Sequence, residues 1–256
     1  MSSLNLLVSV ASEFPVSHLD RVADRVTFQL AIAMASGEVV PFKIAASPGP
    51  AQHVIAREIE PKRLPAFCPE RHINSDGSFC INWIQGDPRP VVDTESARAW
   101  WASLEDYLRL QVAASKLRRW PGPAWAHGHA AEYQRSAEAH ARTLGEPLLS
   151  QVTHGSLTTR LDYRRGHNRI ELRANGEVLN RINLPFRKLT NLQMPCPCPE
   201  GTKTKRPIGQ CGQHAEVLAA LIESLHRRKK AEDKYIADLR KKHIRCCGTL
   251  DRCPLK

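Results

Sequence analysis

Cys80 ends the run His72-Ile73-Asn74-Ser75-Asp76-Gly77-Ser78-Phe79-Cys80, whose residue types suit acyl transfer through a thiol. Asp76 and Gly77 predict a tight turn, and a cysteine that follows such a turn is expected to lie partly exposed. A thiolate is an intrinsic nucleophile, so it needs no strong neighbouring base. Transfer then needs a hydrogen-bond donor for the oxyanion of the tetrahedral intermediate. The turn can bring His72 back alongside Cys80, whereas a plain hairpin with a buried cysteine and a surface histidine is the competing interpretation.

The other cysteines gather near the C-terminus, where six of the eight follow residue 195. In a reducing compartment such clusters indicate metal binding before disulfides, and zinc prefers four thiolate or imidazole ligands in close pairs. We expect a structural zinc site, because no open position or base lies beside the cluster; free thiols or a redox-sensitive disulfide are the alternatives. Cys68 is interpreted as a small, half-buried core residue. The candidate ligands exceed the four that one ion needs, which leaves one or two ions open; they are Cys196, Cys198, Cys211, His214, Cys246, Cys247 and Cys253.

The elements that must position these residues alternate between strands and helices. Strands are expected at 26–30 and 39–44, and a helix capped by Asp93 or Thr94 should bury Trp100, Trp101 and Leu104 on one face. A second helix is expected at 130–144. Asn175-Gly176 predicts a hairpin between 170–172 and 178–182, and a long helix should begin near His214. Gly145-Glu146-Pro147 is the best candidate boundary, which divides the chain into domains 1–146 and 147–256.

The segment from Ile73 to Ile81 resembles the active-site segment of ubiquitin-conjugating enzymes, in which a His-Pro-Asn tripeptide precedes a run of the form Ile-Asn-x-x-Gly-x-Ile-Cys-Leu. Ala130-Ala131-Glu132-Tyr133 is similar to the Ala-Ala-x-x-Tyr segment that opens a later helix of the family, and Pro65 and Phe67 match an upstream strand. The resemblance spans roughly residues 25 to 145. It implies an α+β fold in which an antiparallel meander sheet packs on helices. The C-terminal hairpin and helical extension lies outside the resemblance, and its clustered cysteines are the reason to expect that it binds zinc.

The resemblance also implies an activity. Cys80 would accept a ubiquitin-like protein as a thioester from an activating enzyme and pass it to an amine on a target protein, without a small-molecule cofactor. The match is to divergent bacterial members, which implies a role in antiviral defence alongside an activating enzyme and a deubiquitinase-like protease. A catalytically inert variant of the same fold, acting as a scaffold, is a further interpretation.

The chain departs from the family pattern at three places. His72 stands where the family has its asparagine, so the oxyanion donor would be a titratable imidazole. His127 and His129 lie in the loop where the family has an acidic residue that helps deprotonate the incoming lysine; a histidine can serve there, although an ordinary surface loop is the alternative. No clear amphipathic first helix precedes the strands, which leaves the contact with the activating enzyme open.

Composition favours a cytoplasmic protein with an anionic partner. The chain has 256 residues, 42% hydrophobic composition, no apolar run of membrane-spanning length and no basic leader before its first apolar patch. Its net charge is +11, and residues 227 to 245 hold nine Lys or Arg against three Asp or Glu. This run is either a solvated helix face or a binding patch. The second hypothesis is therefore a zinc-stabilised nucleic-acid-binding protein.

Overall fold

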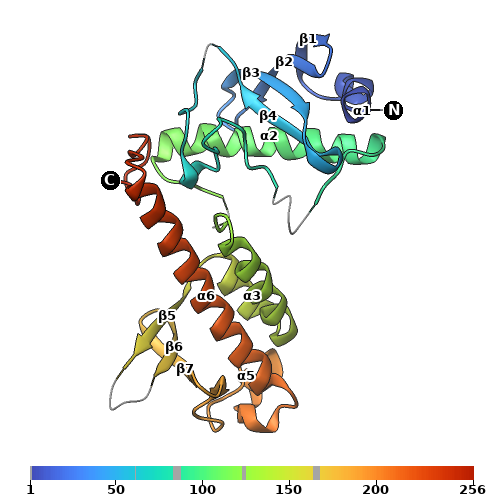
Figure 1. The fold of residues 1–256 in the computed structure, drawn as a ribbon. Helices are drawn as coiled ribbons and strands as arrows, with labels where there is room; N and C mark the ends of the chain where they lie inside the picture. The colour runs from blue at the N-terminus through green and yellow to red at the C-terminus, as the bar shows by residue number, and fades with distance from the viewer. Residues whose placement is uncertain (1, 61, 83–87, 123–124, 164–167) are drawn as a thin grey trace. The chain divides into compact units, whose positions relative to one another are not determined.

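The computed structural model describes residues 2–60, 62–82, 88–122, 125–163 and 168–256 (Figure 1). These fold into two compact units, one of residues 1–122 with 243–256 and one of residues 123–242. The units divide the chain at other residues than the predicted boundary near Gly145. The reason is that the helix at 130–144 packs against the long helix of the second unit, while the last residues of the chain return to the first unit.

The first unit is built on a four-stranded antiparallel meander, β1 (Val16–Val22), β2 (Arg25–Ala33), β3 (Val39–Pro48) and β4 (Val54–Glu58). Both predicted strands are confirmed as parts of β2 and β3. Phe28 pairs with Ile44 and Leu30 with Phe42, so the apolar side chains of the two strands share one face. Burial alternates along β2, which is typical of a sheet with one buried face.

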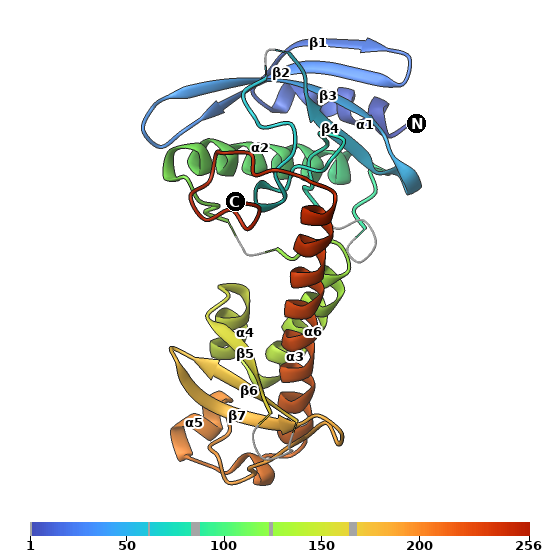
Figure 2. The same cartoon turned by 60° about the vertical axis from the view of Figure 1, so that its left-hand side comes forward.

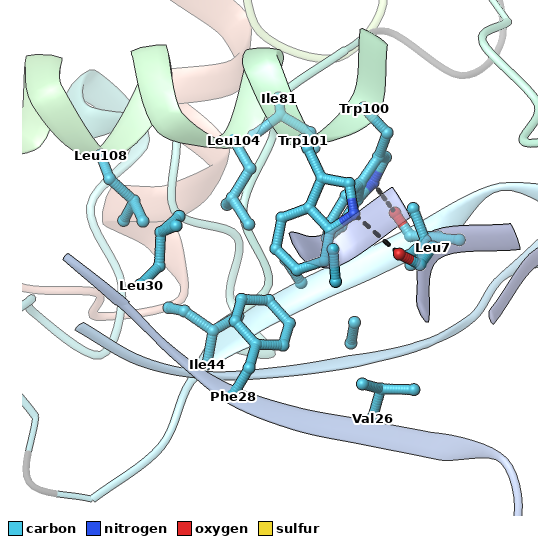
Figure 3. Packing of buried hydrophobic residues seen from close by; sticks show 14 of the residues in the cluster. Leu7, Val26, Phe28, Leu30, Ile44, Ile81, Trp100, Trp101, Leu104 and Leu108 are labelled. Atoms are coloured by element: carbon cyan, nitrogen blue, oxygen red, sulfur yellow. Dashed lines mark hydrogen bonds between the residues drawn. The ribbon is translucent and has the colours of Figure 1, made fainter. Parts of the chain in front are cut away.

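Helix α2 (Thr94–Leu117) covers the buried face of this sheet. Asp93 caps the helix as predicted: its carboxylate accepts from the Ser96 N–H, and the Ser96 hydroxyl oxygen accepts from the Asp93 N–H. Trp101 is fully buried; its ring meets the Phe28 ring edge-on at a centroid distance of 4.6 Å (Figure 3). The apolar face of α2 is thus matched to the inner face of the meander.

A short helix, α1 (Ser3–Val10), precedes the sheet and corrects the expectation that no clear amphipathic first helix precedes the strands. Its leucines are buried in the same core, and the Trp101 indole N–H donates to the Leu7 carbonyl at 3.1 Å (Figure 3). The helix is only 8 residues long, so its apolar side chains do not make a clear periodic pattern in the sequence. Tertiary packing on α2, rather than local propensity, holds it.

The second unit pairs helices with a second meander. It contains α3 (Ala130–Leu144), α4 (Glu146–Thr153), β5 (Leu157–Asp162), β6 (Arg169–Ala174), β7 (Glu177–Asn183), β8 (Lys188–Leu189), α5 (Pro199–Thr204) and α6 (His214–Lys241). The predicted helix at 130–144 and the long helix from His214 are confirmed. Asn175 and Gly176 both have positive φ, 49° and 85°, as the predicted two-residue hairpin turn requires. Alanines of α3 lie at the contact with α6, where small side chains let two helices approach closely.

The tail, residues 243–256, has no regular secondary structure and lies beside the C-terminal end of α2 (Figures 1 and 2). The Asp251 N–H donates to the Arg118 carbonyl at 2.8 Å, and the Arg118 guanidinium donates to the Asp251 carboxylate at 2.6 Å. These two bonds attach the tail to the end of α2. No helix in the described ranges is both long and apolar enough to cross a membrane.

Candidate active site and metal centre

Cys80 is reached through a short hairpin that begins at the 3-10 helix η3 (Pro69–Arg71). The Gly77 N–H donates to the Asn74 carbonyl at 2.9 Å, and Gly77 has φ 77°, which a glycine adopts without strain. The Asp76 carboxylate accepts from the Ser78 hydroxyl at 2.6 Å. The chain then returns, and the Cys80 N–H donates to the His72 carbonyl at 2.8 Å. The predicted turn therefore does bring His72 and Cys80 side by side.

The Cys80 thiol is half-buried, and its Sγ lies 3.9 Å from the Asn82 carbonyl oxygen. Burial raises the pKa of the Cys80 thiol, because a thiolate loses hydration there. A raised pKa keeps the resting side chain protonated, so the thiol is protected from general oxidation and reacts only when its proton is removed. The cysteine is neither sealed in the core nor fully exposed.

His72 is held more tightly than a surface histidine. It is only 5% exposed, its backbone is left-handed (φ 54°), and its ring meets the Trp120 ring edge-on at a centroid distance of 5.1 Å. Its carbonyl accepts from the Tyr107 hydroxyl at 3.1 Å as well as from Cys80. The alternative of a surface histidine on a plain hairpin is therefore wrong. The contact between His72 and Cys80 runs through the backbone, and the imidazole packs against an aromatic ring.

Asn82 is a polar group beside Cys80 that sequence reasoning missed. Its side-chain nitrogen, Nδ2, is buried and has no hydrogen-bond partner among the described residues. A buried amide without a partner is costly, and such groups occur where a ligand or reacting atom supplies the missing contact. Its position two residues after the candidate nucleophile is the one sequence signal that points to it.

Helix α2 anchors the segment that carries His72. The Arg71 guanidinium is 2% exposed and donates to the Gln111 side-chain oxygen at 2.7 Å and to the Gln111 carbonyl at 3.0 Å. In return, the Gln111 amide donates to the Arg71 carbonyl at 2.6 Å. Burial lowers the pKa of Arg71, and these bonds compensate for the lost hydration of the charge. The segment that carries His72 is thus fixed to a rigid helix rather than left as a free loop.

His127 and His129 belong to the second unit, at the start of α3. The His127 backbone N–H donates to the Glu232 carboxylate at 2.6 Å, its ring nitrogen Nδ1 lies 3.0 Å from the same carboxylate, and its ring stacks on Tyr235 at 5.3 Å. His129 is exposed and precedes the helix without a capping bond from its side chain. Both lie outside the unit that holds Cys80, so a role for either in proton transfer stays a prediction.

Four of the seven predicted metal ligands come together in the second unit: Cys196, Cys198, Cys211 and His214, whose ligand atoms all lie within 4.8 Å of one another. Cys198 Sγ lies 3.7 Å from Cys211 Sγ, and His214 Nδ1 lies 3.2 Å from Cys196 Sγ and 3.3 Å from Cys211 Sγ. Tetrahedral zinc with its usual bond lengths separates two sulfurs by about 3.8 Å and a sulfur from a nitrogen by about 3.6 Å. The donor set and its spacing therefore fit one zinc ion.

The backbone at Gly201 favours a thiolate at Cys198 and packs closely against Cys196. The Gly201 N–H donates to Cys198 Sγ at 3.2 Å, a bond that stabilises negative charge on sulfur. A Cβ at Gly201 would lie 2.5 Å from the Cys196 Cβ, so only glycine fits at this position. All four ligands are protein groups, which is typical of a structural zinc rather than a catalytic one.

The remaining three predicted ligands, Cys246, Cys247 and Cys253, lie in the tail and belong to the first unit. They therefore do not join the cluster around His214. Cys68 is also placed differently from its expected role as a half-buried filler: it is 1% exposed, and its Sγ lies 3.1 Å from Cys247 Sγ. The two cysteines are 179 residues apart in the sequence, a contact that no local pattern indicates.

Comparison with known families gives two matches. The family model described as a prokaryotic E2 domain matches residues 15–122, which include Cys80 and the anchoring helix α2. The family model described as a cysteine-rich domain, C-terminal to E2 domain, matches residues 126–255, just over half of the chain. No curated protein and no solved structure matches the chain.

Proposed function

Because the chain belongs to the family whose members carry a cysteine-rich domain C-terminal to an E2 domain, we propose that it is a ubiquitin-conjugating-type transferase with Cys80 as its nucleophile. The observation that carries the proposal is the placement of Cys80. Its half-buried thiol ends a hairpin that is hydrogen-bonded to His72 and fixed through Arg71 to α2. We assign the first unit to the ubiquitin-conjugating-enzyme-like fold on the same grounds.

Two chemical steps follow. The Cys80 thiolate attacks the carbonyl carbon of a thioester that joins the C-terminus of a ubiquitin-like protein to an activating enzyme, and the enzyme's thiolate leaves. The new Cys80 thioester is then attacked by an amine nitrogen of the target. The C–N bond forms, the Cys80 thiolate leaves, and the amine's proton passes to a base. His127 and His129 are the candidate bases, in keeping with the chemistry of imidazole.

Two side chains near Cys80 are candidates to stabilise the oxyanion. His72 lies directly beside Cys80 in the backbone, and an imidazole N–H can donate to an oxygen. Asn82 offers a buried amide nitrogen without a partner among the described residues, and an amide donates at any pH. One oxyanion donor contributes about 10²–10³ in rate, so replacing the true donor should be plainly measurable.

The cysteine-rich region serves this activity as a zinc-stabilised extension. Cys196, Cys198, Cys211 and His214 fit a structural ion. Such an ion would make the region rigid enough to contact the modifier, the activating enzyme or the target. From the resemblance alone we further propose that the system acts in bacterial antiviral defence with a deubiquitinase-like protease. In that case a Cys80→Ala change in the intact gene cluster should remove protection against phage, and unchanged protection would reject the defence role.

The direct test is reconstitution. The purified chain is mixed with ATP and with the activating enzyme and ubiquitin-like protein encoded beside its gene. We expect an adduct of the chain and the modifier that disappears on treatment with excess thiol and is missing in Cys80→Ala. Ser75→Ala is the matched control, because Ser75 is exposed on the turn of the same hairpin. An adduct that survives in Cys80→Ala would reject Cys80 as the nucleophile.

A further inference from the structure

The seven cysteines other than the proposed nucleophile and the clustered His214 make eight soft metal donors, which is twice what one tetrahedral ion needs. The cluster in the second unit uses four of them. The other four, Cys68, Cys246, Cys247 and Cys253, all belong to the first unit. This even division is unexpected for cysteines that only fill the core, because a free cysteine behaves there as a small apolar residue without a preferred partner.

The four sulfurs approach one another in two linked pairs. Cys247 Sγ lies 3.1 Å from Cys68 Sγ, which is longer than the roughly 2.05 Å of a disulfide bond. The side chain of Cys253 lies near that of Cys246 and also near Cys68. Cys68 and Cys253 are buried, whereas Cys246 and Cys247 are half-buried. The contact of Cys68 with Cys247 therefore joins the tail to the residue that precedes η3.

Polar groups of the tail lie beside two of these sulfurs. The Gly248 N–H donates to Cys246 Sγ at 3.3 Å. The Thr249 hydroxyl oxygen lies 3.0 Å from Cys247 Sγ. The bond from Gly201 to Cys198 in the first cluster likewise joins a backbone N–H to a sulfur. Such donors stabilise thiolates, the form in which cysteine binds metal.

A buried positive charge faces this group of sulfurs. The Arg71 guanidinium interacts electrostatically with both Cys68 and Cys247, and it is held in place by Gln111. Four thiolates around a divalent cation carry a net charge of −2, which is expensive to bury without a cation nearby. Arg71 offsets part of that charge.

We propose that Cys68, Cys246, Cys247 and Cys253 bind a second structural metal ion, zinc by the softness of its donors. The sulfurs of this group are spaced more widely than the donors of the first cluster. Among the described residues, only the donors of the first cluster all lie within 4.8 Å of one another. The tail has no regular secondary structure, so it can close on the ion. The proposal goes beyond the conjugating activity and does not depend on it.

The ion would connect the tail to the catalytic segment. The Ile73 N–H donates to the Cys68 carbonyl at 3.0 Å and the Cys68 N–H donates to the Ile73 carbonyl at 3.2 Å, so Cys68 and Ile73 bracket η3 and His72. Fixing Cys68 to three thiols of the tail fixes the segment that contacts Cys80. This ion would be a positioning device for the active site, with no contact to the reacting atoms.

The first experiment counts metal ions in the full chain, purified under reducing conditions, by mass spectrometry of the elements. We expect about two zinc ions per chain. Cys68→Ser with Cys253→Ser should lose about one of them, and Cys211→Ser with His214→Ala should lose the other. A single zinc in the unmodified chain, or unchanged zinc in the Cys68 variant, would overturn the proposal.

The second experiment uses the unmodified chain, so it does not depend on the folding of a variant. Thiols are alkylated with N-ethylmaleimide before and after zinc is removed with a chelator, and each cysteine is read by peptide mass spectrometry. We expect Cys68, Cys246, Cys247 and Cys253 to be protected at least tenfold until the chelator is added, whereas Cys80, which is not among the proposed ligands, is alkylated in both states. Equal reactivity of the four cysteines with and without zinc, or a Cys68–Cys247 disulfide under these conditions, would overturn the proposal.

Discussion

At the scale of single residues, the burial of Cys80 determines when its thiol can react. Because the pKa of Cys80 is raised, the thiolate fraction at neutral pH is lower than for an exposed cysteine. In the proposed transfer, the precise position of Cys80 compensates for its low thiolate fraction, so that no strongly activated thiolate is needed. The hairpin fixes the nucleophile, and His72 or Asn82 receives the developing charge.

The raised pKa predicts the pH dependence of Cys80. Below its pKa, the thiolate fraction rises about tenfold for each pH unit, and a raised pKa extends this rise to higher pH. We expect the rate of alkylation by iodoacetamide at Cys80 to climb from pH 7 to beyond 8.5 without levelling off. Peptide mass spectrometry separates Cys80 from the other cysteines. A plateau below pH 8 would mean that the thiol is activated by a neighbouring base.

The two candidate oxyanion donors can be separated by substitution. We expect the variant that removes the true donor, His72→Ala or Asn82→Ala, to slow transfer from Cys80 to lysine by about 10²–10³. If His72 donates, His72→Asn should restore transfer and flatten its pH profile, since an amide does not titrate near neutrality. Single-turnover discharge of the Cys80 thioester measures this step alone. Unchanged discharge in His72→Ala rejects His72 as the donor, and a thermal melt checks that each variant folds.

At the scale of elements, the sequence predicts features that depend on neighbouring residues, but it does not predict contacts between residues far apart in the chain. The cap at Asp93, the limits of α3 and the turn at Asn175 and Gly176 could all be predicted, because each rests on residues that are neighbours in the sequence. Helix α1 could not, because it depends on the contact between Leu7 and Trp101, which lie 94 residues apart. The bond between Arg71 and Gln111 and the contact of Cys68 with the tail could not be predicted either, because each joins residues that are distant in the sequence.

Helix α2 is predicted to hold the catalytic segment through Gln111. In Gln111→Leu the buried Arg71 guanidinium loses the side-chain oxygen that accepts at 2.7 Å, and an unsatisfied buried donor costs about 1–3 kcal/mol. We expect a loss of that size in the free energy of unfolding in urea, followed by tryptophan fluorescence. Gln111→Glu keeps an acceptor for Arg71 and should recover most of the loss. Equal stability of Gln111→Leu and the unmodified chain would contradict the anchoring role.

At the scale of the whole molecule, the chain combines two units with separate cores. Four of the cysteine and histidine residues predicted to bind metal do come together, but the clustering does not indicate how the chain is divided. Sequence reasoning placed all six late cysteines in one region, whereas the tail cysteines return to the first unit. The basic run on α6 is partly paired, as Arg227 with Glu223 and Lys229 with Asp233 show. Nucleic-acid binding stays a prediction, whose signature would be an affinity that falls linearly, on logarithmic scales, with salt.

The second unit is predicted to need its zinc. The apparent binding free energy of a structural zinc, on the order of 10 kcal/mol, is comparable to the whole stability of a domain, about 5–15 kcal/mol. Removing zinc with a chelator should therefore unfold much of this unit, with loss of helical circular dichroism that Zn²⁺ restores and Mg²⁺ does not. An unchanged thermal melt after complete zinc removal would show that the cluster around His214 is not a structural site.

The most direct test of the central claim is the type of bond formed at residue 80. The chain and its Cys80→Ser variant are loaded with the modifier by the activating enzyme and ATP, and the adducts are treated with excess thiol and mapped by mass spectrometry. We predict an adduct on Cys80 that thiol removes, and an oxyester on residue 80 of Cys80→Ser that thiol leaves intact. An adduct on any other residue, or a thiol-resistant adduct on the unmodified chain, would contradict the account.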